Sequence, residues 1–309
     1  MRKKTENMRT LDTFKQYCWL VNTIYRNKRI SLKRIEQLWV EDDLNDGRPL
    51  TRPTFIRLKN AVEDMFGIII ECERKNGYQY YISNPEVLRE HSTQNWMLQT
   101  LTVGNILIDS LAIKDRLVLE EIPAGMEYLQ TIIKAIKTNL VLMMTHQGFD
   151  SPSPKTIAIE PYCLKVFRQR WYLLGKSHQN DKELRIYALD RITKLEETNH
   201  AFEMDPDFNA ADFFKKYFGV FIGENEEPVR IVIRAYGNTI VSLLRTLPKH
   251  HSQKEIRTET DYSDFEYYMV PTKDFKHEIL KEGADLKVLE PKSFQEEIAT
   301  ELKKAIERY

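Results

Sequence analysis

Residues 170–192 of the chain are RWYLLGKSHQNDKELRIYALDRI, two apolar and aromatic runs separated by a polar loop. Such runs, bounded by polar turn residues, predict the two strands of a hairpin. Residues i and i+2 of a strand share a face, so we expect Arg185 and Tyr187 to point to the same side. Tyr172 lies on the preceding strand and Arg191 begins the next one. The pattern therefore predicts that two guanidinium groups and two phenol rings converge.

These four side chains have two interpretations. Guanidinium groups beside phenol rings suit a phosphate, a carboxylate or a nucleotide, through bidentate hydrogen bonds and stacking. In the structural alternative, Arg191 pairs with Asp190 or Glu160 and the tyrosines belong to the core. The residues alone leave both interpretations open.

The strands around this hairpin are short and closely spaced, which is typical of a small barrel. The strand candidates are residues 140–146, 156–162, 164–169, 171–177, 184–190 and 192–197. Apolar residues at helical spacing predict two helices before them, at 94–115 and 124–139. The first of these helices would link domains or pack in a dimer.

The N-terminal third predicts three helices followed by a hairpin. The first helix covers 10–27, the second begins after the N-cap Ser31, and the third follows Thr51 and ends at Gly67. Asn76–Gly77, between the two apolar runs of residues 68–83, is a strong hairpin signal. This order is the plan of a winged helix-turn-helix, which places its third helix in the major groove of DNA.

The exposed face of that third helix carries the predicted DNA contacts. Arginine and asparagine read base edges, while lysine and threonine hold phosphates. The candidate DNA-binding residues are Arg52, Thr54, Arg57, Lys59 and Asn60 on the helix, with Arg74 and Lys75 at the tip of the wing. The alternative interpretation is a solvent-exposed basic helix that binds no ligand.

The charge is unevenly distributed over a chain whose net charge is zero. Residues 1–84 hold 16 Lys/Arg against 11 Asp/Glu, whereas residues 201–309 hold 16 against 21. The excess of basic residues in 1–84 is a weak sign that this N-terminal part binds a polyanionic partner. The alternative is that charge varies by chance between domains.

The C-terminal third alternates strands and helices after an aromatic-rich connector at 199–222. Strands are predicted within VRIVIRAYG, FEYYMVPT and DLKVLEP, and helices within NTIVSLLRTLP and FKHEILKEGA. A last helix begins in SFQEEIATELKKAIERY, where Ser293 and Glu296 form a capping box. An α+β unit is therefore expected here.

The stretch from Pro161 to Ile192 resembles the signature of the WYL domain. Trp171, Tyr172 and Leu173 stand at its naming positions. The family pattern Arg-x-Phe-x-x-Asp-Arg-Ile is matched by Arg185, Tyr187, Asp190, Arg191 and Ile192. The departure is Tyr187, where phenylalanine is usual. The resemblance extends over nearly the whole chain, as a winged helix, a WYL domain and a C-terminal extension.

The resemblance implies a bacterial transcriptional regulator of α+β multidomain fold. It implies an Sm-type, SH3-like β-barrel in the middle and a ferredoxin-like unit at the C-terminal end. It also implies that Tyr172, Arg185, Tyr187 and Arg191 sense a ligand, with single-stranded nucleic acid or nucleotides as the family's examples. The expected division is a winged helix over 1–84, a helical linker over 85–137, the WYL barrel over 138–205, and the connector with its extension over 206–309.

Several protein classes are disfavoured. The three cysteines form no pair motif, which fits a reducing cytoplasm and argues against structural zinc. No run of 18 apolar residues is present, and the start does not resemble a signal peptide. Phosphate-loop, HExxH and nucleophile-elbow motifs are absent from the sequence. We therefore expect a cytoplasmic protein with no catalytic site, no metal and no cofactor.

Two functions remain in view. The first is a ligand-responsive regulator, a homodimer that binds duplex DNA and senses an anionic effector. The second is a single-stranded nucleic-acid-binding accessory protein of a defence or repair system, in which the winged helix binds another protein. Sequence-specific duplex binding separates the two hypotheses.

Overall fold

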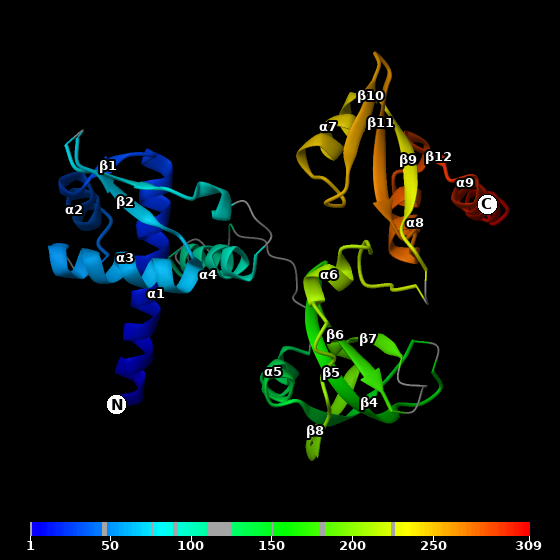
Figure 1. The fold of residues 1–309 in the computed structure, drawn as a ribbon, viewed down its shortest axis with the longest axis horizontal. Coiled ribbons are helices and arrows are strands. Elements are labelled where there is room, and N and C mark those ends of the chain that lie inside the picture. Colours follow the sequence, from blue (N-terminus) through cyan, green and yellow to red (C-terminus); the bar gives the residue numbers. More distant parts are fainter. Residues whose placement is uncertain are drawn as a thin grey trace. The chain divides into compact units, whose positions relative to one another are not determined.

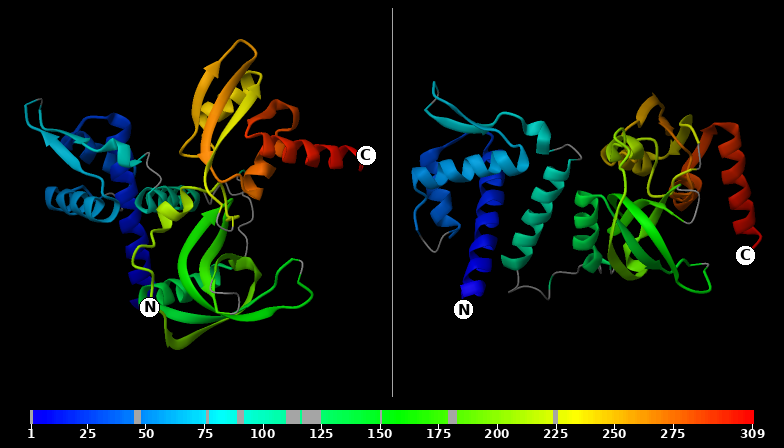
Figure 2. Two further views of the ribbon diagram at one scale, coloured as in Figure 1. Left: turned by 45° about the vertical axis from the view of Figure 1, so that its right-hand side comes forward. Right: turned by 60° about the horizontal axis from the view of Figure 1, so that its bottom comes forward.

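The structure is a computed structural model of the chain, which divides into two compact units, Met1–Leu119 and Glu120–Tyr309. Figures 1 and 2 show the helices and strands of each unit. The residues that the structure describes are 2–44, 48–75, 77–88, 92–109, 116, 125–149, 151–178, 183–223 and 226–309.

The first unit combines helices with a small antiparallel sheet. Its elements are α1 (Arg2–Asn27), β1 (Ile30–Ser31), α2 (Leu32–Glu41), α3 (Arg52–Phe66), β2 (Ile70–Glu73), β3 (Gln79–Ile82) and α4 (Thr93–Asp109). The first helix begins earlier than predicted, at Arg2 instead of residue 10. The predicted starts of α2 and α3 are confirmed, because the Ser31 hydroxyl accepts the N–H of Arg34 and that of Thr51 accepts the N–H of Thr54. Gly67 ends α3 in the left-handed conformation, with φ of 65°.

The predicted hairpin is confirmed by the pairing of β2 with β3, within a sheet of order β1-β3-β2. Glu73 pairs with Gln79, so the loop covers residues 74–78, of which Asn76 lies outside the described residues. Gly77 and Tyr78 have φ of 80° and 56°. The chain reverses here through left-handed backbone, for which glycine is well suited.

Helix α4 belongs to the core of the first unit. It runs beside α1 (Figure 2), and Leu98 is buried with apolar residues of α1 and α3. The described helix ends at Asp109, and residues 110–115 of the predicted helix lie outside the described residues. Within its own unit, this helix therefore packs as a fourth helix.

The second unit begins with a five-stranded antiparallel sheet of order β7-β6-β5-β4-β8. Its elements are α5 (Leu129–Thr138), β4 (Leu140–His146), β5 (Lys155–Phe167), β6 (Arg170–Ser177), β7 (Leu184–Ala188) and β8 (Ile192–Ala201). Helix α5 packs on this sheet through the buried Ile132 and Ala135. Trp171 also packs against this core, as its alternation with Tyr172 predicts.

The sheet corrects two predictions. It is not a closed barrel, since in the described part of the chain no pairing joins its edge strands β7 and β8. The chain leaves β7 through a 3-10 turn at Leu189–Arg191, and β8 then pairs with β4. The predicted strands 156–162 and 164–169 are one strand, β5, because Pro161 lies at a bulge that the pairing with β6 tolerates.

The turn between β5 and β6 consists of Arg168 and Gln169, because Phe167 pairs with Arg170. Both turn residues have positive φ, 48° and 64°. This is the backbone of a type I′ turn, which is uncommon for residues other than glycine, asparagine and aspartate.

The rest of the second unit is a connector followed by a four-stranded sheet of order β10-β11-β9-β12. The elements are α6 (Ala210–Phe214), β9 (Val229–Tyr236), α7 (Asn238–Thr246), β10 (Lys254–Thr258), β11 (Tyr262–Met269), α8 (Lys273–Lys281), β12 (Leu286–Glu290) and α9 (Lys292–Ile306). A core of sixteen buried residues, Phe265 and Phe275 among them, joins the helices to the sheet.

Two sequence predictions fail in this part. Strand β10 was not predicted, because all five of its residues are exposed and show no alternation. The predicted capping box is wrong: α9 begins at Lys292 after the N-cap Pro291, so Ser293 lies inside the first turn.

Gly175 on β6 is required by the close approach of β5. A Cβ at this position would lie 2.6 Å from the carbonyl oxygen of Glu160 and 2.8 Å from Cγ1 of Ile159.

We expect Gly175→Ala to lower the free energy of unfolding of the second unit by about 1–3 kcal/mol, the usual cost of overpacking. Urea unfolding combined with hydrogen exchange on β5 measures this. Gly148→Ala is the control, because its nearest neighbour would be 3.4 Å away; equal effects of the two variants would contradict the prediction.

Candidate functional site

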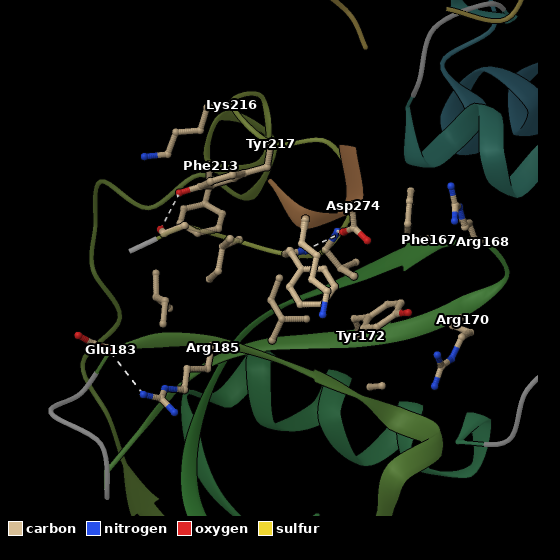
Figure 3. Close-up of a pocket in the computed structure, with 18 of the residues that line it drawn as sticks. Phe167, Arg168, Arg170, Tyr172, Glu183, Arg185, Phe213, Lys216, Tyr217 and Asp274 are labelled. Carbon is tan, nitrogen blue, oxygen red and sulfur yellow. Dashed lines mark hydrogen bonds and ion pairs between the residues drawn. The ribbon is translucent and has the colours of Figure 1, made fainter. Parts of the chain in front are cut away.

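An open cavity of about 1290 Å³ lies within the second unit. One wall is formed by β6 and β7, and the opposite wall by the connector residues 213–223 and the start of α8. Figure 3 shows Tyr172 and Arg185 on the strand side, with Phe213, Lys216 and Tyr217 on the connector side. The cavity is therefore built from segments that are far apart in the sequence.

Three of the four predicted ligand residues line this cavity, namely Tyr172, Arg185 and Arg191. The fourth, Tyr187, packs against the core of the five-stranded sheet, with its ring 5.4 Å edge-on from His146. Burial raises the pKa of the Tyr187 phenol. The structure thus brings three of the residues together and places Tyr187 behind them.

The two predicted arginines have defined neighbours. Arg191 lies with its guanidinium carbon 3.2 Å from the ring centroid of Phe149, a cation–π contact. Arg185 lies at the start of β7, with a guanidinium nitrogen 3.6 Å from a carboxylate oxygen of Glu183. The Asp190 carboxylate, which the sequence offered as a partner for Arg191, binds Arg170 at 2.5 Å. The cavity thus holds cations that lie against aromatic rings or carboxylates.

Positive charge dominates the lining. The seven basic residues are Arg168, Arg170, Lys176, Arg185, Arg191, Lys216 and Lys273, against the three acidic residues Glu183, Glu227 and Asp274. Burial also raises the pKa of Tyr172, which keeps its phenol protonated as a hydrogen-bond donor. A cavity with this excess of cations attracts anions.

Aromatic rings line the same cavity. They belong to Phe149, Phe167, Tyr172, Phe213, Tyr217 and Phe221. Rings offer flat apolar faces on which nucleobases stack, while neighbouring cations bind the phosphates. The arrangement is chemically suited to nucleotides or a short single strand.

Sequence reasoning missed the second wall. Lys216 and Lys273 lie outside the WYL-like motif, and Phe213 and Tyr217 belong to the aromatic-rich connector, where a packing role is the ordinary expectation. Tyr217 is indeed buried, yet it also lines the cavity. Arg168 and Arg170 are inside the motif region but are not among the four residues that the resemblance assigns to ligand sensing. No local signal distinguishes Lys216 or Lys273 from an ordinary surface lysine.

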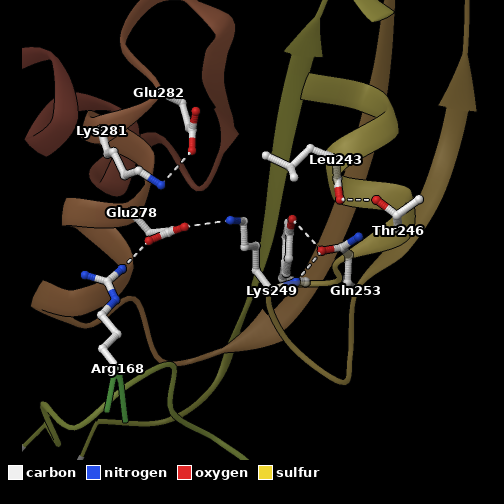
Figure 4. A network of polar contacts seen from close by, with 9 residues as sticks. Arg168, Leu243, Thr246, Lys249, Gln253, Glu278, Lys281 and Glu282 are labelled. Carbon is white, nitrogen blue, oxygen red and sulfur yellow. Dashed lines mark hydrogen bonds and ion pairs between the residues drawn. The ribbon is translucent and has the colours of Figure 1, made fainter. Parts of the chain in front are cut away.

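Glu278 on α8 connects the two sheets of the second unit (Figure 4). One carboxylate oxygen accepts a hydrogen bond from Arg168 in the β5–β6 turn, and the other accepts one from Lys249 at 2.7 Å. The Glu278 side chain is only 7% exposed. Burial opposes its ionisation, but Lys249, Lys281 and Arg168 outweigh this and lower the pKa of Glu278.

Asp274, one turn before Glu278, holds the connector. Its carboxylate accepts the backbone N–H groups of Val220 at 2.6 Å and Phe221 at 2.8 Å. Gly219 is needed beside them, because it has φ of 82° and a Cβ there would overlap the Asp274 carboxylate. Helix α8 therefore positions both the β5–β6 turn and the connector wall.

Lys165 on β5 also contacts the connector, from the side of the five-stranded sheet. Its ammonium donates to the carbonyl oxygen of Gly219 and lies 3.9 Å from the ring centroid of Phe214. Burial lowers the pKa of Lys165 to about 8. This half-buried cation adds a second link between the sheet and the cavity wall.

The predicted DNA contacts lie on two surfaces of the first unit. On α3, Arg52, Arg57 and Asn60 are exposed, while Thr54 and Lys59 are half-buried. The Thr54 hydroxyl hydrogen-bonds that of Thr51 at 2.9 Å, and Lys59 lies 3.9 Å from Glu63. Arg74 and Lys75 are exposed in the loop between β2 and β3.

Two known domain families match the sequence of the second unit. Residues 127–197 match the WYL domain model, and residues 226–306 match the WCX domain model. The chain carries a WYL domain and a WCX domain. The cavity lies at the junction of the two: its strands belong to the WYL domain, its connector wall lies between the matched regions, and α8 belongs to the WCX domain. No curated protein matches the sequence.

Two solved structures are similar at low identity. Proteasome accessory factor B/C (PafBC) of Arthrobacter aurescens has 17% identity and a TM-score of 0.31, and the match covers 80% of this chain and 39% of that chain. A CRISPR Cas-related protein has 12% identity and a TM-score of 0.40, over 97% of this chain and 85% of that chain. The present chain thus spans less than half the length of the PafBC chain.

Among the described residues, no cluster of three or more His, Cys, Asp or Glu residues could hold a metal ion. None of the helices described has the length and apolar character needed to cross a membrane.

The Glu278 link between the two domains is testable by Glu278→Gln. This change removes the charge that Arg168 and Lys249 share, and we expect the free energy of unfolding of the second unit to fall by about 1.5–3 kcal/mol. Because the Glu278 pKa is lowered in the folded protein, its contribution is present above the unfolded pKa and is lost as pH falls through the folded one. Urea unfolding at neutral and acidic pH should therefore show a smaller difference between wild type and variant in acid.

The matched control is Glu297→Gln on α9. Glu297 pairs with Lys276 at 2.7 Å but is 52% exposed. A surface pair of this kind contributes roughly 0–1 kcal/mol. If both variants are equally stable, Glu278 does not hold the domains together.

Proposed function

We propose that the protein is a ligand-responsive transcriptional regulator that binds duplex DNA through its first unit and senses an anionic, nucleic-acid-like effector in the WYL–WCX cavity. The observation that carries the proposal is the lining of that cavity, in which seven basic residues and six aromatic rings face the same space. The WYL domain is consistent with regulators of transcription. The proposal includes no catalytic step, metal or cofactor.

The proposed architecture follows the element order. In the first unit, three helices precede the β2–β3 hairpin, which forms a three-stranded sheet with β1, as in a winged helix. In the WCX domain, the order β9-α7-β10-β11-α8-β12 is that of a ferredoxin-like unit. We assign DNA binding to residues 1–84, effector binding to the WYL domain, and homodimer formation to the assembled regulator.

The effector proposed is a short single strand or a nucleotide. Duplex DNA hides its base faces, whereas a single strand offers both bases for stacking and phosphates for ion pairing. Tyr172 and Arg191 would contact a base and a phosphate, with Arg185 at the rim. Tyr187, behind them, would act by positioning its neighbours on β7.

Effector binding would compete with existing ion pairs. Arg168 is held by Glu278, Arg170 by Asp190, and Arg185 by Glu183. A phosphate that draws Arg168 from Glu278 weakens the link between the WYL sheet and α8. Since α8 also holds the connector through Asp274, the effect of binding would reach the whole WCX domain.

Effector binding is tested with a labelled single-stranded oligonucleotide over a salt series. We expect Arg185→Ala/Arg191→Ala to lower affinity at least tenfold and to reduce the salt slope by roughly one to two units, because about 0.7 counterions are released per phosphate contact. The control is Lys137→Ala/Lys194→Ala, which removes two exposed charges outside the cavity. No difference between the two double variants would contradict the cavity as the effector site.

Duplex binding is tested with Arg57→Ala and a randomised duplex library. We expect wild type to enrich a preferred sequence, and the variant to lose roughly tenfold or more in affinity for it, since a base contact contributes about 1–3 kcal/mol. Arg257→Ala, on strand β10 of the other unit, is the charge-matched control. Tight single-strand binding without any duplex enrichment would instead favour the accessory protein of a defence or repair system.

A further inference from the structure

Helix α3 exposes one large apolar side chain on the face assigned to DNA. Ile56 is 46% exposed, whereas Phe55, Leu58, Val62 and Phe66 of the same helix are buried. Single exposed apolar residues are normal on protein surfaces. The position of Ile56 within the helix, among the polar residues assigned to base contacts, suggests a role in binding.

Ile56 lies between the polar residues that are assigned to base contacts. Arg52 precedes it by four residues and Asn60 follows it by four, so the three side chains lie on one side of the helix. Arg57 is the next residue and is also exposed. An apolar group here is flanked by donors on both sides along the helix axis.

The charge along α3 orients this face toward nucleic acid. Arg52 and Arg57 lie in the first half of the helix, whereas Glu63 and Asp64 lie in the second half. Phosphates are attracted to the first half and repelled from the second. A recognition helix contacts base edges through its N-terminal residues, the part in which Ile56 lies.

The major groove displays one apolar group, the 5-methyl of thymine. The other bases present only hydrogen-bonding groups at this edge. An isoleucine against such a group would displace its water without replacing the lost hydrogen bond. We propose that Ile56 reads a thymine 5-methyl group in the DNA site, next to the bases contacted by Arg57 and Asn60. This inference rests on the proposed duplex binding and adds a specificity determinant to it.

The experiment removes the methyl group alone. A preferred duplex is first selected with the full-length wild-type chain from a randomised library, and each thymine in it is then replaced singly by deoxyuridine. We expect at least one position per half-site where this replacement lowers wild-type affinity roughly three- to tenfold, the effect of losing about one buried methyl group. Ile56→Ala should bind the thymine duplex with the same loss and be indifferent to deoxyuridine at that position.

Two further variants sharpen the test. Ile56→Val keeps two methyl groups and should retain most of the thymine preference. Ile133→Ala, on α5 of the other unit and 42% exposed, is the matched control and should behave as wild type. Circular dichroism spectra verify that all variants are folded.

The outcomes separate this inference from the proposed function. A selected duplex without any deoxyuridine-sensitive position, or with a sensitivity that Ile56→Ala retains in full, overturns the reading of thymine by Ile56 while duplex binding stands. Failure of wild type to enrich any duplex overturns DNA binding itself, and this inference with it.

Discussion

The buried carboxylate of Glu278 is the interaction on which the arrangement of the second unit depends. A buried charge is tolerated only when it is paired and hydrogen-bonded. Glu278 meets this requirement with two cations from different places, Arg168 in the WYL domain and Lys249 in the WCX domain. The desolvation cost of one side chain is therefore offset only when the two domains are correctly placed.

The same helix forms the cavity wall. Phe275 and Ile279 of α8 are buried in the WCX core, while Asp274 points to the connector and Glu278 to the β5–β6 turn. A helix presents different faces to different neighbours, so one rigid element fixes the core, the connector and the turn together. The space left between them is lined by cations and aromatic rings that come from the strands, the connector and α8.

Local features of the first unit were predictable from the sequence. Caps at Ser31 and Thr51 and the glycine end of α3 depend on a few neighbouring residues, and the structure confirms all three. Two failures share a cause. The bulge at Pro161 and the exposed edge strand β10 are decided by pairing with other strands, β6 and β11. The open sheet in place of a closed barrel belongs to the same class.

For the candidate site, the sequence by itself determined the strand side. Alternation and the WYL-like motif indicated Tyr172, Arg185 and Arg191, and these residues line the cavity. Only the tertiary structure decided the opposite wall, since Lys216 and Lys273 come from segments outside the motif. It also placed Tyr187 against the core of the five-stranded sheet and Arg168 against Glu278. A side chain's face within a strand follows from backbone geometry, but its partner across a cavity follows from how two sheets pack, which no local pattern encodes.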